Sequence, residues 1–364
     1  MRGISILGST GSIGKSALAV LARQRDAFTV VGLTALQNRA ALERQAGEWK
    51  PRVSGLVSEQ GAELLVEAAT HPDADIVLNA VVGTAGLDAT LAALRAGKRV
   101  ALANKETLVM AGDLVHEAQR AGGGELIPVD SEHSAVLQCI AGRETGVARL
   151  ILTASGGPFR EWSPERIAKA TVEEALNHPT WQMGNKVTVD SASLANKALE
   201  VIEAHHLFGL GYDALDVVVH PQSIVHAFVE FCDGSVIGQL AFPSMELPIL
   251  YAFTHPGRLP DAGVRRFDPV AAGALTFEPV RTEVFRAFRA GIAAGRAGGT
   301  SPAVFNAANE AAVAAFLAGR IRFGQIAETI ETVLDQHRNE PVRDLETVRA
   351  ADRWSRDRAH EVLK

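Results

Sequence analysis

Three carboxylates in two segments of the chain have the chemistry of ligands for a divalent metal ion. Asp130 and Glu132 follow the apolar run Leu126 to Val129, which predicts a strand. In an extended backbone, residues i and i+2 project to the same side, so these two side chains could converge on a hard cation. Acid pairs at strand ends are more often solvated caps. A third acid, Glu200, shifts the interpretation towards a metal site.

Polar residues around Glu200 suit a phosphate group. If Ser191 caps a helix, Asn196 and Lys197 lie four and three residues before Glu200, and all three side chains lie near one helix face. The serine and the helix N-terminus then favour an anion, the lysine neutralises it, and the glutamate completes an oxygen-ligand metal site. An intrahelical Lys–Glu pair on the surface would explain the charges but not the neighbouring serine and asparagine.

Two further polar turns follow predicted strands. Ser155 lies in the flexible turn Thr153 to Phe159, which could also bind phosphate. Lys105 lies in Asn104-Lys105-Glu106, after the fifth predicted strand, at the sheet edge where α/β proteins hold ligands. Its ammonium group could meet an anionic substrate oxygen, although the triplet alone is more typical of a polar loop.

The segment His178 to Gly184 contains Trp181 and Met183 between a proline and a glycine. Large apolar side chains on such a loop favour a lid that closes over a ligand. The alternative is a loop that places Trp181 in the core.

A glycine-rich loop, Gly8 to Gly14, separates the apolar run Ile4 to Leu7 from a predicted helix, Lys15 to Arg23. Glycines in this position let the backbone turn tightly and approach a pyrophosphate, which the helix N-terminus stabilises. The spacing is G-x-x-G-x-x-G and does not match a Walker A loop. The alternative is an ordinary strand-to-helix turn that binds no ligand.

The second predicted strand, Phe28 to Leu33, is not followed by the acid that usually binds the adenosine ribose of NAD. Asn38 and Arg39 follow instead, and they could bind the 2′-phosphate of NADP. The competing interpretation makes Arg39 a solvated residue at a helix start.

These residues require a scaffold of alternating strands and helices. Six short β-branched runs alternate with helical stretches up to Val129, which predicts βαβ units and a parallel sheet covered by helices on both faces. Beyond Ala148 the pattern is α+β, with a hairpin turning at Cys232-Asp233-Gly234. Near the C-terminus we expect a helix with Ser301 as N-cap, Pro302 at its first position and Gly319 at its stop.

The predicted fold class is therefore α/β, with an N-terminal Rossmann-like doubly wound parallel sheet, an α+β catalytic domain and a C-terminal helical domain. We expect an NADPH-binding domain at 1–122, a catalytic domain that binds metal and substrate and carries the lid at 123–254, a connector at 255–282 and a helical domain at 283–364.

Composition excludes several functional classes. With 36 basic and 42 acidic residues in 364, the net charge is −6, so the chain offers no basic face for nucleic acid. No apolar run approaches the ~20 residues of a membrane span, and the first apolar stretch is too short for a signal peptide. We expect a cytoplasmic protein. Cys139 and Cys232 lie far apart and are interpreted as packed thiols.

The ordered set of motifs resembles the 1-deoxy-D-xylulose 5-phosphate reductoisomerase family over nearly the whole chain. The set comprises Gly8 to Gly14, Asn104-Lys105-Glu106, Asp130-Ser131-Glu132, Ser155 to Phe159, His178 to Gly184, Ser191 to Glu200, His220-Pro221-Gln222-Ser223 and Asn306 to Glu310. The resemblance implies a homodimeric enzyme of the non-mevalonate isoprenoid pathway. Such an enzyme uses NADPH and Mg²⁺ or Mn²⁺ to isomerise and reduce 1-deoxy-D-xylulose 5-phosphate to 2-C-methyl-D-erythritol 4-phosphate.

The resemblance also implies roles for single residues. The metal ligands are Asp130, Glu132 and Glu200, which with Lys105 form the catalytic group. The substrate-binding residues are Lys105, Ser131, Glu132, Ser155, His178, Trp181, Met183, Ser191, Asn196, Lys197 and Glu200. The cofactor-binding residues are Thr10, Gly11, Ser12, Ile13, Asn38, Arg39, Asn104, Glu106, Gly184 and Met245. Relatives often carry glycine and a basic residue where this chain has Leu36 and Gln37, which leaves the contacts to the 2′-phosphate open.

Two other functions fit parts of the sequence. An NADP-dependent sugar-phosphate or homoserine-type dehydrogenase would need the glycine loop and a lysine but no set of three carboxylates. A nucleotide-binding redox regulator would use the first domain alone and would not need the segment Ser191 to Glu200.

Overall fold

The computed structural model describes residues 1–143 and 145–364 and divides the chain into two compact units. Unit 1 comprises Met1–Thr107, Asp113–Glu144 and Ser244–Phe267. Unit 2 comprises Leu108–Gly112, Thr145–Pro243 and Asp268–Lys364. Each unit is therefore built from separate stretches of the sequence.

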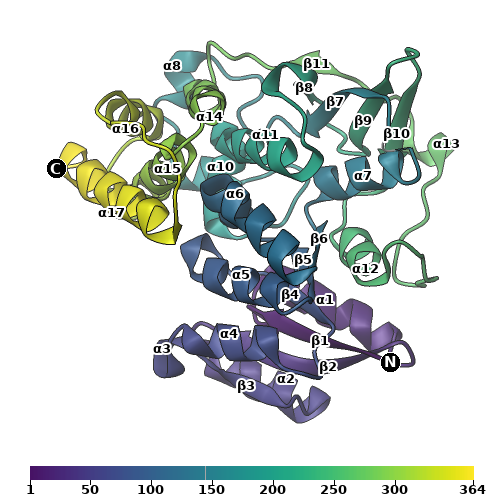
Figure 1. Cartoon of the computed structure of the whole chain (residues 1–364). Coiled ribbons are helices and arrows are strands. Elements are labelled where there is room, and N and C mark those ends of the chain that lie inside the picture. The colour runs from purple at the N-terminus through teal and green to yellow at the C-terminus, as the bar shows by residue number, and fades with distance from the viewer. Residues whose placement is uncertain (144) are drawn as a thin grey trace. The chain divides into compact units, whose positions relative to one another are not determined.

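Unit 1 contains a six-stranded parallel sheet (Figure 1). Its strands are β1 (Arg2–Leu7), β2 (Phe28–Ala35), β3 (Val53–Leu56), β4 (Ile76–Asn79), β5 (Arg99–Leu102) and β6 (Glu125–Pro128). The order β3-β2-β1-β4-β5-β6 is that of the dinucleotide-binding Rossmann fold. The predicted doubly wound sheet is confirmed.

The helices of unit 1 connect successive strands and cover the sheet. They are α1 (Ser12–Arg23), α2 (Arg39–Trp49), α3 (Val57–Gln60), α4 (Glu63–Thr70), α5 (Leu87–Arg95), α6 (Lys105–Gly122, of which Leu108–Gly112 belongs to unit 2), α7 (Ser131–Ile140) and α12 (Glu246–Thr254), with the short 3₁₀ helix η1 (Gly83–Gly86). Right-handed crossovers place α1 and α2 on the face opposite α4 and α5, and α12 packs beside α1. The core of unit 1 includes Ile249, Ala252 and Phe253 of α12, together with residues of all six strands.

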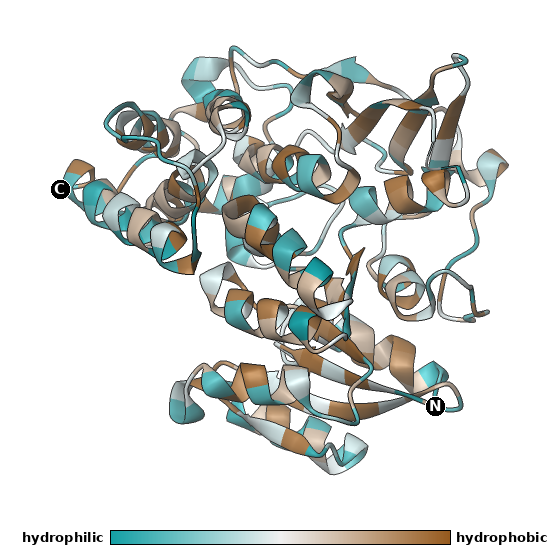
Figure 2. Cartoon of the chain, viewed as in Figure 1, coloured by the Kyte–Doolittle hydropathy of each residue, from teal (hydrophilic) through white to brown (hydrophobic). Residues whose placement is uncertain are grey.

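Unit 2 contains a five-stranded mixed sheet in the order β10-β9-β7-β8-β11. Its strands are β7 (Val147–Ala154), β8 (Leu215–Val219), β9 (Val225–Phe231), β10 (Val236–Leu240) and β11 (Glu278–Pro279). β9 and β10 form the antiparallel hairpin that the Asp-Gly turn predicts. Figure 2 shows the first sheet and β9 as mainly hydrophobic, in keeping with their burial, whereas β10 and β11 are more exposed.

The remaining elements of unit 2 are helices. They are α8 (Pro164–Ile167), α9 (Val172–Leu176), α10 (Asn185–Ser193), α11 (Ala195–Phe208), η2 (Tyr212–Ala214), α13 (Pro269–Ala272), α14 (Arg286–Ala297), α15 (Ser301–Leu317), α16 (Gly324–Asp335) and α17 (Leu345–Val362). α15 is buried along nearly its whole length, and α14, α16 and α17 pack around it. The predicted C-terminal helical region is confirmed.

Four local expectations were wrong. Asp130 and Glu132 do not share an extended strand: β6 ends at Pro128, Asp130 is the N-cap of α7, and Glu132 lies in its first turn. Ser191 does not cap a helix, because α10 already begins at Asn185. The N-cap of α15 is Thr300 rather than Ser301. Cys139 is buried as expected, but Cys232 is exposed at the hairpin turn.

Within residues 1–143 and 145–364, no helix combines the length and the hydropathy that a bilayer-crossing segment requires.

Candidate active site

The glycine loop of unit 1 follows β1, at the point where the strand order reverses between β1 and β4. Gly8 has φ +87°, and a Cβ there would lie 2.7 Å from the carbonyl oxygen of Ala80. A Cβ on Gly14 would lie 2.5 Å from the carbonyl oxygen of Gly8. Gly11 is the exposed N-cap of α1 and has no side chain to occupy the first N–H groups of the helix. The loop therefore has the geometry of an anion site at a helix N-terminus.

The residues after β2 are engaged in local contacts. The Asn38 side chain accepts a hydrogen bond from the Ala41 N–H at 3.2 Å and caps α2. Arg39 is exposed and forms an ion pair with Glu59, which raises the pKa of its guanidinium group. A 2′-phosphate at Arg39 would therefore compete with Glu59 for the same donors.

Asn104 connects the loops that follow β4 and β5. Its Oδ1 accepts a hydrogen bond from the N–H of Thr107 at 3.0 Å, and its Nδ2 donates to the carbonyl oxygens of Val81 and Gly83 at 2.7 and 2.8 Å. Nδ2 also donates to the buried carboxylate of Glu106 at 2.9 Å. These contacts hold Lys105, the first residue of α6, at the carboxyl edge of the sheet.

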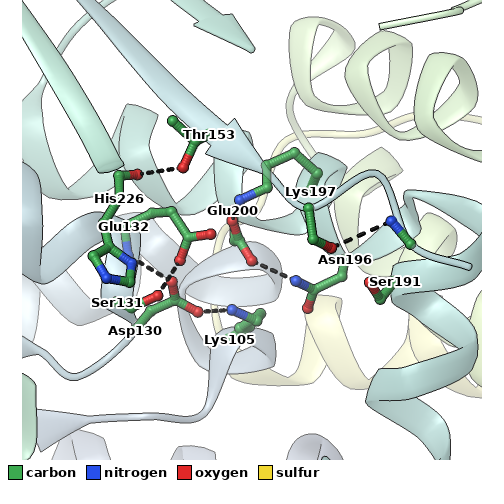
Figure 3. Close-up of polar contacts among 12 residues, drawn as sticks. Lys105, Asp130, Ser131, Glu132, Thr153, Ser191, Asn196, Lys197, Glu200 and His226 are labelled. Atoms are coloured by element: carbon green, nitrogen blue, oxygen red, sulfur yellow. Dashed lines mark hydrogen bonds and ion pairs between the residues drawn. The ribbon is translucent and has the colours of Figure 1, made fainter. Parts of the chain in front are cut away.

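Lys105, Asp130 and Glu132 form the charged cluster of unit 1 (Figure 3). The Lys105 ammonium group forms an ion pair with Asp130 Oδ2. Asp130 Oδ1 accepts a hydrogen bond from the N–H of Glu132 at 3.3 Å, and the Ser131 hydroxyl donates to Glu132 Oε2 at 2.5 Å. Two carboxylates and a lysine thus lie together. The contact arises because Asp130 caps α7 and Glu132 lies in its first turn, and not because the two acids share a strand.

Unit 2 holds a second charged cluster on α11. Asn196 Nδ2 donates to Glu200 Oε1, and the Lys197 ammonium group forms an ion pair with Glu200 Oε2 (Figure 3). The side chains of Lys197 and Glu200 are only 4% and 2% exposed. The spacing argument from the sequence is confirmed for these three residues, but the surface alternative is wrong, since the pair is buried.

His178 links Ser155 and Ser191 in unit 2. Its Nδ1 accepts hydrogen bonds from the N–H groups of Thr180 and Trp181 at 3.1 and 2.9 Å, so the ring proton resides on Nε2. Nε2 lies 3.0 Å from Ser155 Oγ and 3.1 Å from Ser191 Oγ. Burial lowers the pKa of His178 to about 4, and the ring is neutral near pH 7. The arrangement presents two hydroxyl groups around one N–H donor.

Trp181 and Met183 lie on a loop between α9 and α10, as predicted, and both are half-buried. The Trp181 ring makes an edge contact with His226 of β9, with centroids 6.3 Å apart. Gly184 is the N-cap of α10 in unit 2. Met245 is the N-cap of α12 in unit 1.

Trp181→Ala is expected to raise the KM for the substrate and to lower kcat, because a lid both holds its ligand and excludes water. Its melting temperature should change little. Trp162→Ala is the matched control: Trp162 is also half-buried but packs on the core residue Phe159, with ring centroids 4.5 Å apart. If Trp181→Ala instead loses about 3 to 5 kcal/mol of unfolding free energy and keeps normal kinetics, Trp181 is a core residue and not part of a lid.

Sequence reasoning missed polar residues that the structure places beside the predicted ones. His226 is buried against Trp181, and its signal was a histidine within the apolar run of β9. Asp190 is buried on α10 and pairs with Lys186 at 2.9 Å, a spacing of four residues that an earlier helix start would have made visible.

The strand order and the glycine loop place the chain among Rossmann-fold proteins. Family models narrow this class. A model described as 1-deoxy-D-xylulose 5-phosphate reductoisomerase matches residues 4–65 and 56–112, and models of two C-terminal domains of that enzyme match 126–208 and 240–358. The chain belongs to the 1-deoxy-D-xylulose 5-phosphate reductoisomerase family.

Full-length relatives agree with this assignment. Curated reductoisomerases of this name from Geotalea uraniireducens and Geobacter sp. strain M21 are 47% and 50% identical over 382 residues, covering 100% of this chain and 99% of each relative. The solved reductoisomerase from Zymomonas mobilis in complex with NADPH is 40% identical, with a TM-score of 0.92, covering 100% of this chain and 99% of that chain. A DOX-P reductoisomerase in complex with NADPH, fosmidomycin and magnesium is 38% identical, with a TM-score of 0.91, covering 100% and 98%.

Proposed function

We infer that this chain is an NADPH- and divalent-metal-dependent enzyme that isomerises and reduces 1-deoxy-D-xylulose 5-phosphate to 2-C-methyl-D-erythritol 4-phosphate, a reaction of the non-mevalonate isoprenoid pathway. Beyond family membership, the buried pair of Lys197 and Glu200 carries this inference. A simple NADP-dependent dehydrogenase needs no buried carboxylate at this place, and a nucleotide-binding regulator would not use the segment at all.

NADPH is assigned to unit 1, apart from a contact to Gly184 of unit 2. The open N-terminus of α1 at the sheet's switch point fits a pyrophosphate. We propose that its contacts come from Thr10, Gly11, Ser12, Ile13, Asn38, Arg39, Asn104, Glu106, Gly184 and Met245. The preference for NADPH over NADH rests on Arg39 and on the absence of an acid in the segment Leu36 to Asn38.

The metal is assigned to Asp130 and Glu132 of unit 1 and to Glu200 of unit 2. Carboxylate oxygens are the ligands that Mg²⁺ and Mn²⁺ prefer, so the donor set fits either ion. Each unit also carries a lysine that offsets part of the negative charge of its acid: Lys105 pairs with Asp130, and Lys197 pairs with Glu200. When bound, such an ion polarises carbonyl and hydroxyl oxygens of a substrate.

The substrate is assigned to hydroxyl, amide and cationic side chains of both units. Its phosphate would contact Ser155, Ser191, Asn196 and Lys197, and the neutral His178 would hold the two serine hydroxyls with its Nε2–H group. Lys105, Ser131, Glu132 and Glu200 would contact the reacting part of the sugar. Trp181 and Met183 would cover it and exclude water during rearrangement and hydride transfer.

The direct test is oxidation of NADPH with 1-deoxy-D-xylulose 5-phosphate, measured by absorbance with and without Mn²⁺. We expect turnover only with substrate, NADPH and metal together. Metal-independent turnover of this or another sugar phosphate would favour the simpler dehydrogenase, and no turnover in any mixture would favour a regulator.

Arg39→Asp is expected to reduce the preference for NADPH over NADH about tenfold, because a carboxylate repels the 2′-phosphate. The control is Glu59→Gln, which removes the acid that pairs with Arg39 and should strengthen NADPH binding. Kinetics with both cofactors measure the effect. A parent enzyme that uses NADH equally well contradicts the assignment.

The oligomeric state, the cellular location and the roles of the four sequence segments stay predictions. A homodimer is supported by β10 of unit 2, an edge strand on which Val236 and Leu240 are exposed, since such an edge can pair with a second copy. Light scattering would test the oligomeric state, and cell fractionation would test the cytoplasmic location.

We propose that residues 1–122 bind the cofactor, that 123–254 bind metal and substrate, that 255–282 form a connector and that 283–364 form a supporting helical domain. The compact units nevertheless group residues 244–267 with the first sheet.

A further inference from the structure

Helix α10 is fastened to the C-terminal helices of unit 2 through a buried carboxylate. Asp190 is 1% exposed, and it accepts an ion pair from Lys186 at 2.9 Å, one turn earlier on α10. It also accepts a hydrogen bond from Asn309 Nδ2 of α15 at 2.8 Å, and this bond is buried. This hydrogen bond from Asn309 links α15 to Asp190 on α10.

The orientation of the Asn309 amide is set by this bond. A carboxylate accepts hydrogen bonds only, so the NH₂ group of Asn309 must face Asp190. Its Oδ1 then points away and has no hydrogen-bond partner within the described part of the chain, although Asn309 is fully buried. An unpaired buried oxygen is unfavourable, and an apolar residue would have avoided it. In return, the Asn309 amide donates a hydrogen bond to Asp190.

The carboxylate that Asn309 holds is adjacent to a residue assigned to the phosphate. Ser191 follows Asp190, and successive side chains on a helix point about 100° apart. Asp190 therefore turns towards α15, whereas Ser191 turns towards His178, whose Nε2 lies 3.1 Å from Ser191 Oγ. A small rotation or slide of α10 would move the serine hydroxyl out of reach of the imidazole.

The neighbouring loop leaves little room for such a shift. Gly157 has φ +65°, and a Cβ there would lie 2.7 Å from the backbone carbonyl oxygen of Ser191. Gly157 N also donates to Ser155 Oγ at 3.2 Å. The backbone carrying Ser155 is thus packed against α10, and the position of α10 decides whether both serines meet the same imidazole.

We propose that Asn309 is a positioning residue: by holding Asp190, it fixes α10 so that Ser191 and Ser155 are aligned on His178 to receive the substrate phosphate. This inference rests on the proposed function of that site. Asn309 does not touch the substrate and acts through Asp190.

The test compares two asparagines of α15. Asn309→Leu removes the donor to Asp190. Asn306→Leu is the matched control, because Asn306 is equally buried and its Oδ1 also lacks a partner among the described residues. Its Nδ2 donates to Glu310 of α15 at 3.2 Å and to the Met110 sulfur of α6 at 3.7 Å, and neither partner is on α10. The measurements are the KM for 1-deoxy-D-xylulose 5-phosphate, the KM for NADPH, kcat, and the inhibition constant of inorganic phosphate.

Asn309→Leu is expected to raise the sugar-phosphate KM and the phosphate inhibition constant about tenfold, since a small displacement of a binding group weakens its contacts strongly. The KM for NADPH should rise less than the sugar-phosphate KM, because only Gly184, the N-cap of α10, lies in unit 2 among its proposed contacts. The fall in kcat should also be smaller than the rise in the sugar-phosphate KM. Asn306→Leu should leave all four values within about twofold of the parent.

A reciprocal exchange keeps the test decisive if Asn309→Leu does not fold. Asn309→Asp alone sets two carboxylates against each other and should weaken phosphate binding. Adding Asp190→Asn restores a donor and an acceptor in reverse order and should recover most of the loss. Equal effects of the two leucine variants, or no recovery in the exchange, would overturn the inference. A parent enzyme without sugar-phosphate turnover would instead overturn the proposed function, and the inference with it.

Discussion

Glu200→Gln is expected to lower kcat/KM by at least about 100-fold while leaving NADPH binding unchanged. The amide keeps the size of the side chain and can still accept a hydrogen bond from Asn196, but it removes the negative charge from the proposed metal site. Metal ions contribute several kcal/mol to such reactions, and each 1.36 kcal/mol corresponds to about tenfold in rate. NADPH binding, followed by fluorescence, should persist because the glycine loop belongs to unit 1.

Glu203→Gln is the control for this prediction. Glu203 lies on the same helix and is similarly buried, at 3% exposure. Its variant should retain the Mn²⁺ dependence of the parent. Normal activity of Glu200→Gln at saturating Mn²⁺ would remove Glu200 from the ligand set. Loss of activity in Glu203→Gln alone would transfer the role to that acid.

Lys197→Ala is expected to weaken inhibition by a short phosphonate hydroxamate such as fosmidomycin by about 100-fold. One end of this inhibitor resembles the substrate phosphate and the other chelates metal ions, so a single association step makes two sets of contacts. Lys197 is a buried cation that we propose as the phosphonate's partner, and charge-assisted hydrogen bonds are worth about 1.5 to 3 kcal/mol. Inhibition should be competitive with the sugar phosphate and should require divalent metal.

Removing Lys197 also deprives Glu200 of its buried ion-pair partner, so a second variant separates the two effects. Breaking one side of a buried pair typically costs about 3 to 5 kcal/mol, whereas replacing both sides can be nearly neutral. Lys197→Met with Glu200→Gln should therefore unfold closer to the parent than Lys197→Met alone. Lys169→Ala removes an exposed lysine and should leave inhibition unchanged. Equal inhibition constants in the parent and Lys197→Ala would show that Lys197 does not hold the phosphonate.

The sequence predicted regular elements well where the pattern was local. The alternation of β-branched runs with helical stretches predicted the parallel sheet, and the Asp-Gly turn at 233–234 predicted the β9–β10 hairpin. The spacing of Asn196, Lys197 and Glu200 predicted their meeting on α11. In each case the geometry follows from the period of one element.

The errors arose at the ends of elements and in contacts between distant segments. The first turns of α10 contain three β-branched residues, Val187, Thr188 and Val189, which have low helix propensity. The predicted helix therefore began only at Ser191, six residues after the observed start at Asn185. The sequence around Asp130 is compatible with either a strand end or a helix N-cap. In the structure Asp130 caps α7, because β6 already ends at Pro128. The hydrogen bond between Asn309 and Asp190 joins residues 119 positions apart, a separation that no local pattern reports.

The discontinuous composition of unit 1 has a consequence for protein synthesis. Its hydrophobic core includes Ile249 and Phe253, which are translated more than 100 residues after Val129, the last core residue of the sheet region. A nascent chain that ends before α12 therefore lacks part of this core, and we expect the sheet of unit 1 to mature only after α12 leaves the ribosome. For the same reason, a fragment that stops after β6 should expose apolar surface, and it would depend on chaperones or aggregate when expressed alone.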